Sequence, residues 1–540
     1  MNVRNPINLE SLKDLLGGLP LVPEVYWYLR QPGKPVTAKF ALDRLQKSLP
    51  TWATQARTSQ PSSQGGKQVV IFATLRYWVE QVTAIALALA GQGNSVTLAF
   101  SPFAAWQKPL NRFDLRRQNV YAQNILGMAG PLVKVVSFLN GRGEVRTLPE
   151  LLDKIIQDVA LKDTQYTLQQ EQVDLRSELF ALRLERNREA AGSALSFLKI
   201  NRPDVVIIPN GTILEFAAVY QAAKWLGIPV NTFEFGEQRQ RVWLAQNAEV
   251  MRQDTTALWE AHQHKVLTED QLVQVRHLFS SRQRASLWEN FARRWQGVPS
   301  EGGDRVRAAL NLDNRPLVLL ATNVIGDSLT LGRQVFSDSM TEWLQRSVEF
   351  FSHHPEVQLV IRIHPGELIT KGPSVADVVK ASLEAVDDLP VTADHIHLVP
   401  AEARINTYDL VELADIGLVY TTTVGLEMAM SGIPVIVVGN THYRGRGFTL
   451  DPESWDGYFE MLIQVLHRPD HYRLSYQQVN QAWNYAYRFF FEYPLPFPWH
   501  LVHFWEDISE WPIQRVLSSE GREKFGQTFR NLAGEPITWI

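Results

Sequence analysis

The chain has 540 residues, of which 45% are hydrophobic and 20% are charged, and this composition is typical of a globular protein with two or three domains. The net charge of −4 and the lack of a basic run argue against a nucleic-acid partner, and zero cysteines exclude disulfides, thiolate metal sites and a cysteine nucleophile. Because the sequence shows neither a signal peptide nor a membrane span, we expect a cytoplasmic protein, with contact to the inner membrane surface left open.

The first half of the chain predicts an open parallel sheet that is interrupted by a large insertion. Residues 1–66 form a helical lead-in that ends in a Ser/Gln/Gly linker. Strands at 69–73 and 96–100 flank a helix at 78–90, which is the start of a doubly wound unit. From about 103–198 the pattern is helical and charged, and we expect this insertion to brace the sheet.

The sheet resumes after the insertion with another β-α-β pattern. It consists of a strand at 204–209, a helix at 213–226 and a strand at 229–233. A charged helical segment follows at about 258–310. We therefore expect an N-terminal Rossmann-like domain at 67–310.

A second parallel sheet follows, and we assign it to a C-terminal domain at 311–470. The strands are apolar and are separated by helical stretches, as in a second Rossmann-like domain. No GxGxxG motif follows the first strand of either half, so a dinucleotide site is not indicated. The last segment, 471–540, is rich in aromatic residues, and we expect most of them to be buried. The strands of the second sheet begin at Leu317, Gln358, His397, Ile416 and Pro434.

The most informative pattern is a hydroxyl-rich turn in the second sheet. An apolar strand at 416–420 runs into three threonines, and a helix then opens at Val424 with Gly425 and Glu427 in its first turn. Main-chain N–H groups and hydroxyls at such a turn suit a phosphate, and a carboxylate one turn deeper suits ribose hydroxyls. Threonine also caps helices, which is the purely structural alternative. The three residues are Thr421, Thr422 and Thr423.

A His-Pro-Gly sequence stands at the end of another strand of the same sheet. The strand at 358–363 leads directly into His364, Pro365 and Gly366. Ligands of open parallel sheets bind outside the carboxyl ends of the strands, where this histidine is expected. Alternation along the strand places Arg362 on the same face as His364. Together with the threonines, these residues predict a clamp for a phosphate or diphosphate.

The His-Pro at a strand end, the threonines before a G-x-E helix and the Gly-Ile-Pro-Val strand resemble the capsule polysaccharide biosynthesis family, which includes the bacterial Kdo transferases. A glycine-punctuated loop after that strand extends the resemblance, which covers roughly 317–449. More distantly, the chain resembles bacterial sialyltransferases, whose His-Pro and Ser/Thr motifs hold the phosphate of CMP. The resemblance implies a GT-B fold, with two facing Rossmann-like domains, a helical insertion and a C-terminal helix that crosses back to the first domain.

For the donor, the resemblance implies a nucleotide-sugar co-substrate held by the C-terminal domain without a metal or another cofactor. It implies that Glu427 binds the ribose, in addition to the phosphate clamp described above. Tyr443, Arg444 and Arg446 lie on the glycine-punctuated loop, where they are expected to contact the donor. The Kdo transferases usually carry a small residue and a tryptophan at the two arginine positions, so the identity of the sugar stays open.

For the acceptor, if the reaction inverts the configuration of the sugar, a base that deprotonates the attacking hydroxyl is expected from the N-terminal domain. The strand end at 233–237 offers Glu234 as the first candidate and Glu237 as the second, and it loosely resembles the acidic-Asp-Gly motif of related transferases. Phe235 replaces the central acid of that motif. Candidate acceptor-binding residues are Asn210, Arg239 and Arg241.

These observations favour a metal-independent glycosyltransferase that moves a sugar, with a CMP-sugar favoured, onto a surface polysaccharide or glycolipid. One alternative is a CDP-alcohol-dependent glycerophosphotransferase of teichoic acid type, because the same motifs occur there. Nucleotide-sugar epimerases of this architecture and a non-catalytic nucleotide-sugar-binding protein are further alternatives. The sequence leaves the acceptor, the stereochemical outcome and the oligomeric state undetermined.

Overall fold

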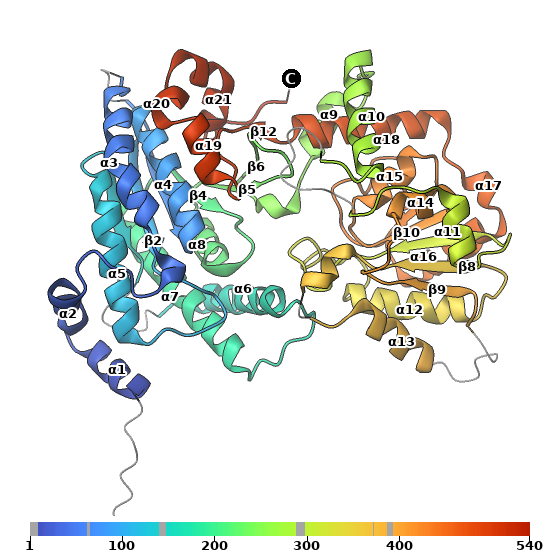
Figure 1. The fold of residues 1–540 in the computed structure, drawn as a ribbon, viewed down its shortest axis with the longest axis horizontal. Coiled ribbons are helices and arrows are strands. Elements are labelled where there is room, and N and C mark those ends of the chain that lie inside the picture. Colours follow the sequence, from blue (N-terminus) through green and yellow to red (C-terminus); the bar gives the residue numbers. More distant parts are fainter. Residues whose placement is uncertain are drawn as a thin grey trace, which may run out of the picture. The chain divides into compact units, whose positions relative to one another are not determined.

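A computed structural model describes the chain at 9–61, 65–139, 147–287, 297–370, 372–385 and 393–539. Parts of the predicted lead-in, insertion and interdomain segment therefore lie outside the described residues. The chain forms two compact units, each built on its own parallel sheet (Figure 1). Unit 1 comprises Met1–Thr164, Asp174–Met251 and Leu495–Thr538, and unit 2 comprises Gln165–Val173, Arg252–Pro494 and Trp539–Ile540.

Unit 1 contains a seven-stranded sheet in the order β12-β6-β5-β4-β1-β2-β3. The five strands from β5 to β3 in this order are parallel, and β6 and β12 extend the sheet with antiparallel pairing. The apolar runs of β1 and β4 are buried almost throughout, as expected for central strands covered by helices on both faces. The strands are β1 (Gln68–Thr74), β2 (Ser95–Ser101), β3 (Val133–Ser137), β4 (Val205–Pro209), β5 (Val230–Phe235), β6 (Arg241–Gln246) and β12 (Leu495–Pro496).

The predicted insertion contributes a strand as well as helices. Val133–Ser137 pairs in parallel with β2, which makes β3 an edge of the sheet inside a stretch that we expected to be wholly helical. The residues VKVVS interrupt the apolar run with Lys134 and lie between two helical patterns, which hides the strand signal. The helices of unit 1 are α1 (Leu9–Gly18), α2 (Val22–Arg30), α3 (Asp43–Thr58), α4 (Arg76–Gly91), α5 (Arg112–Leu126), α6 (Glu150–Leu168), α7 (Glu178–Asn201), α8 (Leu214–Trp225), α19 (Phe504–Glu510), α20 (Ile513–Val516) and α21 (Ser519–Leu532).

Unit 2 contains a five-stranded, fully parallel sheet in the order β11-β10-β7-β8-β9. Its core includes the fully buried Trp343, Leu320 and Phe351. The strands are β7 (Leu317–Ala321), β8 (Gln358–Arg362), β9 (Ile396–Val399), β10 (Ile416–Val419) and β11 (Val435–Val437). The helices are α9 (Thr256–His262), α10 (Glu269–Gln283), α11 (Gly303–Ala309), α12 (Met340–Ser352), α13 (Val375–Glu384), α14 (Thr407–Leu413), α15 (Val424–Met430), α16 (Trp455–His467), α17 (Pro469–Tyr472) and α18 (Tyr476–Tyr487).

The two parallel cores share one strand order. Read from β3 to β5, and from β9 to β11, each sheet follows the order 3-2-1-4-5 of its own strands. The chain therefore reverses direction across the sheet between β1 and β4 in unit 1, and between β7 and β10 in unit 2. Ligands of such sheets bind at the carboxyl ends beside this switch point. The predicted fold class of two Rossmann-like α/β units is confirmed.

The borders of the units differ from the expected domain borders in three places. Gln165–Val173, within the expected N-terminal domain, belongs to unit 2. The helices α10 and α11 precede residue 310 but pack on α18 and α14, so they belong to unit 2. The C-terminal segment divides after Pro494, and Leu495–Thr538 joins unit 1. Most of its aromatic side chains are buried, as predicted; among them are Tyr485, Phe489, Phe490, Tyr493, Phe497, Trp499, Phe504 and Trp511.

Candidate functional site

In unit 1, two polar residues meet at the carboxyl ends of β4 and β5, one strand away from the switch point. The side-chain amide of Asn210 donates a 2.8 Å hydrogen bond to one carboxylate oxygen of Glu234, and the other oxygen accepts from the N–H of Phe235 at 3.1 Å. Asn210 has a φ of 59°, in the left-handed region that asparagine tolerates better than most residues. Its own side-chain oxygen accepts from the N–H groups of Thr212 and Ile213.

Burial changes the acidity of Glu234. The side chain is only 7% exposed, and removal of water from around the carboxylate raises the pKa of Glu234 to about 7, although its hydrogen bonds from Asn210 and Phe235 oppose this shift. A carboxylate with a pKa near neutrality can take up a proton at physiological pH.

The other predicted residues of unit 1 surround the end of β5. Arg239 forms an ion pair with Asp507 of α19, which raises the pKa of this guanidinium. Arg239 therefore binds a carboxylate of the protein itself. Glu237 is half-buried in the turn after β5, and Arg241 begins β6 opposite Pro496.

The sequence did not single out His500, which lies next to this turn. Its ring is 1% exposed, contacts Phe235 edge-on at a centroid distance of 5.1 Å and lies 3.0 Å through Nε2 from the carbonyl oxygen of Gly236. Burial lowers the pKa of His500, so the ring is neutral and Nε2 donates to that carbonyl. Asp507 also accepts from the main-chain N–H of His500 at 2.8 Å. No local sequence pattern around a single histidine in an aromatic segment indicates that His500 contacts the turn after β5.

In unit 2, the predicted phosphate clamp lies beside the switch point. Asn323, which follows β7, accepts a 3.1 Å hydrogen bond from the N–H of Thr421, which follows β10. The hydroxyl of Thr322 accepts from the N–H of His364, after β8, at 3.2 Å. Polar contacts therefore join the carboxyl ends of β7, β8 and β10. Thr322 and Asn323, which follow β7, contact His364 and the threonine turn, respectively.

The ring of His364 is oriented by its own turn. Its Nδ1 accepts a 2.9 Å hydrogen bond from the N–H of Gly366, which caps the short 3₁₀ helix Pro365–Ile369. In neutral imidazole this bond places the proton on Nε2. The residue as a whole is exposed, whereas the neighbouring Ile363 is buried. His364 thus presents an N–H donor at the carboxyl end of β8.

The threonine turn contains a buried hydroxyl that makes no hydrogen bond to the described residues. Thr421 is 9% exposed, and its hydroxyl has no hydrogen-bond partner among the described residues. The carbonyl of Thr422 accepts a 2.6 Å bond from the hydroxyl of the fully buried Tyr443. A Cβ on Gly425 would lie 2.4 Å from that hydroxyl, so only glycine permits the approach. Tyr443 therefore shapes the turn from inside. Thr423 is the residue before α15 and makes no side-chain cap.

Arg362 makes internal contacts that the sequence did not foresee. It is 4% exposed, and its guanidinium donates to the carbonyl oxygens of Pro400 at 2.7 Å and Ile405 at 3.2 Å. Burial lowers the pKa of Arg362 to about 10, which still leaves it charged at neutral pH. The side chain holds the segment between β9 and α14 instead of facing a ligand.

Glu427 is likewise engaged inside the unit. It forms an ion pair with Arg282 of α10, and both side chains are 3% exposed. Burial raises the pKa of Glu427, and the charge of Arg282 opposes that shift. Helix α15 turns this carboxylate toward α10, whereas the expected contact was with a ribose. The sequence separation of 145 residues between the partners explains why no local pattern revealed the pair.

The two arginines of the glycine-punctuated loop have different environments. Arg444 donates to the carbonyl oxygens of Val437 and Pro452, and burial lowers its pKa. Arg446 is half-buried and donates to the hydroxyl of Thr256 at 3.0 Å. Arg444 thus closes the loop on itself. In the described part of the chain, no group of three or more His, Asp or Glu side chains is arranged to hold a metal ion.

Comparison with known proteins gives likenesses of fold only. No family model and no curated protein matches the chain. Solved structures that are similar include a β-Kdo 2,4 transferase, KpsC, of Thermosulfurimonas dismutans, with 16% identity over 52% of this chain and 78% of that one and a TM-score of 0.32. A UDP-GlcNAc 2-epimerase of Neisseria meningitidis has 13% identity over 79% of this chain and 100% of that one, with a TM-score of 0.25.

A sucrose-phosphate synthase of Thermosynechococcus elongatus is also similar, with 13% identity over 86% of this chain and 99% of that one and a TM-score of 0.29. By their names, the three proteins are a transferase, an epimerase and a synthase. At such identities and TM-scores, none of the likenesses assigns a substrate or an activity to this chain.

Proposed function

We propose that this protein is a glycosyltransferase that moves a sugar from a nucleotide-activated donor to an acceptor hydroxyl. The observation that carries the proposal is the buried Glu234 at the end of β5, with a pKa of about 7 and a fixed partner in Asn210. A CMP-sugar is the favoured donor, on the strength of the sequence motifs, and the acceptor is a surface polysaccharide or glycolipid.

Glu234 serves as the base in this proposal. The acceptor oxygen forms a bond to the anomeric carbon of the donor sugar while its proton passes to the carboxylate of Glu234. The bond between that carbon and the phosphate oxygen breaks, and the electron pair leaves with the nucleotide. A pKa near neutrality keeps a useful fraction of the base ionised while still allowing it to accept the proton. Glu237 is the second candidate for this role.

In this proposal, the donor phosphate binds at the carboxyl ends of β8 and β10 in unit 2. His364 donates from Nε2, the hydroxyl of Thr421 supplies a hydrogen bond, and Thr422 and Thr423 complete the turn. Pro365 and Gly366 set the position of the histidine. Stabilisation of a departing phosphate by fixed donors is the kind of electrostatic contribution that lowers such barriers most.

Five of the predicted residues receive supporting roles instead of direct contacts. Tyr443 and Gly425 shape the threonine turn, Arg362 and Arg444 hold neighbouring loops, and Glu427 pairs with Arg282. Each of these charged or polar groups is bonded to the protein, so a ligand would have to displace an internal partner to reach it. Arg446, on the same loop as Arg444, remains a candidate donor contact.

A thermal-shift screen tests the donor assignment. The purified protein is scanned with CMP, CDP, UDP, GDP and dTDP, because a ligand that binds only the folded state raises the melting temperature. We expect CMP to stabilise the protein and His364→Ala to abolish the shift. The matched control is His353→Ala, which removes an exposed histidine elsewhere in unit 2.

The outcomes separate the competing functions. Stabilisation by UDP, GDP or dTDP without CMP would keep sugar transfer and reject the CMP donor. A response to CDP, with release of CMP from a CDP-alcohol and no turnover of CMP-sugars, would indicate the glycerophosphotransferase. A response to none of the nucleotides would contradict the proposed donor site.

A further inference from the structure

The first two helices of unit 1 expose an unusual number of large apolar side chains. In α1 and the residue after it, the exposed leucines stand at spacings of three and four; in α2 and the residue before it, four exposed residues follow the same spacing. Each helix therefore has one apolar stripe that faces solvent. We call these seven residues the apolar surface: Leu12, Leu15, Leu19, Leu21, Val25, Tyr28 and Leu29.

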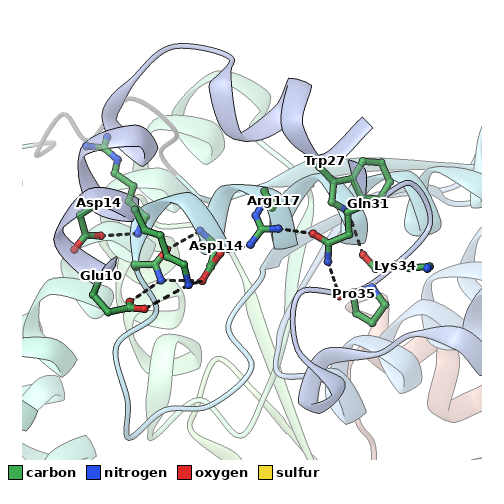
Figure 2. Close-up of polar contacts among 11 residues, drawn as sticks. Glu10, Asp14, Trp27, Gln31, Lys34, Pro35, Asp114 and Arg117 are labelled. Carbon is green, nitrogen blue, oxygen red and sulfur yellow. Dashed lines mark hydrogen bonds and ion pairs between the residues drawn. The ribbon is translucent and has the colours of Figure 1, made fainter. Parts of the chain in front are cut away.

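The polar side of α1 faces the protein. Asp14 accepts from the main-chain N–H of Arg112 at 2.9 Å, Glu10 accepts from Asn111 at 2.8 Å, and Lys13 pairs with Asp114 at 3.1 Å (Figure 2). The partners all belong to α5 or to the residue that caps it. Glu10 and Asp14 remain exposed while they make these contacts, so the charged residues lie at the border between α1 and α5 and the leucines occupy the outer side of the helix.

Helix α2 is attached in the same way. Glu24 accepts two hydrogen bonds from the guanidinium of Arg116, at 2.8 and 2.7 Å. Trp27 is buried and donates to the carbonyl of Lys34, and Gln31 donates to the carbonyl of Pro35, which folds the following segment back on the helix (Figure 2). The polar contacts thus fix both helices with their apolar stripes outward.

The exposed charges at the end of α2 and after it are positive. The acids of the two helices, Glu10, Asp14 and Glu24, all bond α5 or its cap, although Glu10 and Asp14 also stay exposed. Among the described residues, no ion pair involves the exposed Arg30 at the end of α2, or Lys34 and Lys39 further along the chain. Cations beside an exposed apolar stripe are complementary to a surface that is apolar inside and anionic outside.

We propose that the apolar surface of α1 and α2 docks on a lipid bilayer that contains anionic lipids. The helices have 10 and 9 residues, and no helix among the described residues is long and apolar enough to cross a membrane, so they would lie in the interface. The leucines enter the boundary of the acyl chains, Tyr28 lies at the level of the headgroups, and the cations contact lipid phosphates. This inference does not depend on the proposed sugar transfer.

A second copy of the chain is a poorer occupant. In a symmetric dimer the same patch faces itself, so the three cations of one copy and the three of the other would share one interface. Like charges across an interface weaken association. The anionic bilayer satisfies both the apolar side chains and the cations.

Vesicle sedimentation of the full chain tests the proposal. One set of vesicles is phosphatidylcholine alone, and the other also contains phosphatidylglycerol. We expect binding to the second set, weakened by high salt, and a fall of at least about tenfold in the partition coefficient for L15E/L29E, since both side chains leave water in the bound state. Leu15 and Leu29 are 69% and 74% exposed, so the exchange is tolerated by the fold.

Two control variants make the result specific. V266E and I200E replace side chains that are 91% and 82% exposed at other places and should bind vesicles as the parent does. R30Q/K34Q/K39Q should lose the preference for phosphatidylglycerol by about tenfold or more. Circular dichroism and melting temperature confirm that each variant is folded. The proposal is overturned if the parent ignores both vesicles, if L15E/L29E binds unchanged, or if light scattering shows a dimer that only L15E/L29E dissociates.

Discussion

Asn210 and Glu234 join the carboxyl ends of two neighbouring parallel strands through one 2.8 Å hydrogen bond from amide to carboxylate. The amide is oriented because its oxygen accepts from the N–H groups of Thr212 and Ile213, which leaves its nitrogen to face Glu234. The carboxylate is thereby held in place while burial raises its pKa to about 7. The predictions for unit 1 follow from this pair.

Replacement of Glu234 by glutamine should lower turnover by about 100-fold or more, the range typical of the loss of a general base. The nucleotide-induced thermal shift should persist, because the donor residues lie in unit 2. In the parent protein, turnover should fall as the pH drops through about 7, since the carboxylate becomes protonated. Steady-state kinetics with a CMP-sugar across pH measure both effects. If E234Q kept full turnover and E237Q lost it, the base would be Glu237.

The same substitution should change how stability depends on pH. Burial raises the pKa of Glu234 from 4.5 to about 7, so the folded state binds its proton more tightly than the unfolded state does. For a raised carboxyl pKa, stability is lost as pH rises through this window, by up to about 3 kcal/mol above pH 7. Glutamine carries no charge to desolvate, but its NH2 group must face one of two donors, the amide of Asn210 or the N–H of Phe235, at a cost that does not depend on pH. Relative to the parent, E234Q should therefore gain stability as the pH rises from 4.5 to about 7.

Below pH 4.5 the carboxyl is neutral in both states, and the difference between E234Q and the parent should no longer change with pH. Melting curves of both proteins across this pH range provide the measurement. A parent protein that is equally stable relative to E234Q at pH 5 and pH 8 would contradict the raised pKa.

Asn210→Gly should move the acid limb of the pH–rate profile to higher pH. Glycine adopts the φ of 59° without strain, so the backbone is kept while the hydrogen bond that stabilises the ionised Glu234 is lost. The pKa of Glu234 should rise further. Asn311→Gly is a suitable control because Asn311 has a φ of 55° and is exposed. An unshifted profile for N210G would show that the amide does not stabilise the anion.

The parallel strands and their ends were predictable from the sequence because apolar runs and the turns after them are local signals. The positions of Glu234, His364 and the threonines at strand ends follow from the same signals. The strands β3, β6 and β12 were not predicted. β3 and β6 contain the charged residues Lys134 and Arg241, and β12 has only two residues, one of them a proline.

The partners of the site residues were not predictable, because they come from distant parts of the chain. Arg282 reaches Glu427 from α10, and Pro400 and Ile405 occupy Arg362 from the loop after β9. The sequence of a motif is the same whether its charged residue contacts a ligand or an internal partner. Only the tertiary contacts distinguish the two cases.

Loss of the carboxylate of Glu427 should destabilise unit 2 by about 3–5 kcal/mol, because it leaves the buried guanidinium of Arg282 without its counter-charge. The paired replacement R282M/E427L should recover much of this loss, since it removes both charges. Urea unfolding of E427Q and the double variant measures the difference. If E427Q instead kept its stability and lost nucleotide binding, Glu427 would be a ribose ligand after all.

Thr421→Val should separate ligand binding from stability. Valine has nearly the shape of threonine, and the hydroxyl that it removes is buried with no hydrogen-bond partner among the described residues. The unliganded variant should therefore be as stable as the parent or more stable, because an unsatisfied buried hydroxyl costs about 1–3 kcal/mol. The thermal shift with CMP should nevertheless disappear, since the proposed phosphate contact is lost.

Thr370→Val is the matched control for this substitution, because the hydroxyl of Thr370 already bonds the carbonyl of Glu367 at 2.9 Å. That variant should keep the CMP shift. A T421V protein that melts lower without ligand and still responds to CMP would mean that the hydroxyl serves the fold rather than the donor. If T421V keeps the stability of the parent and loses the thermal shift with CMP, the hydroxyl of Thr421 bonds the ligand and not the protein.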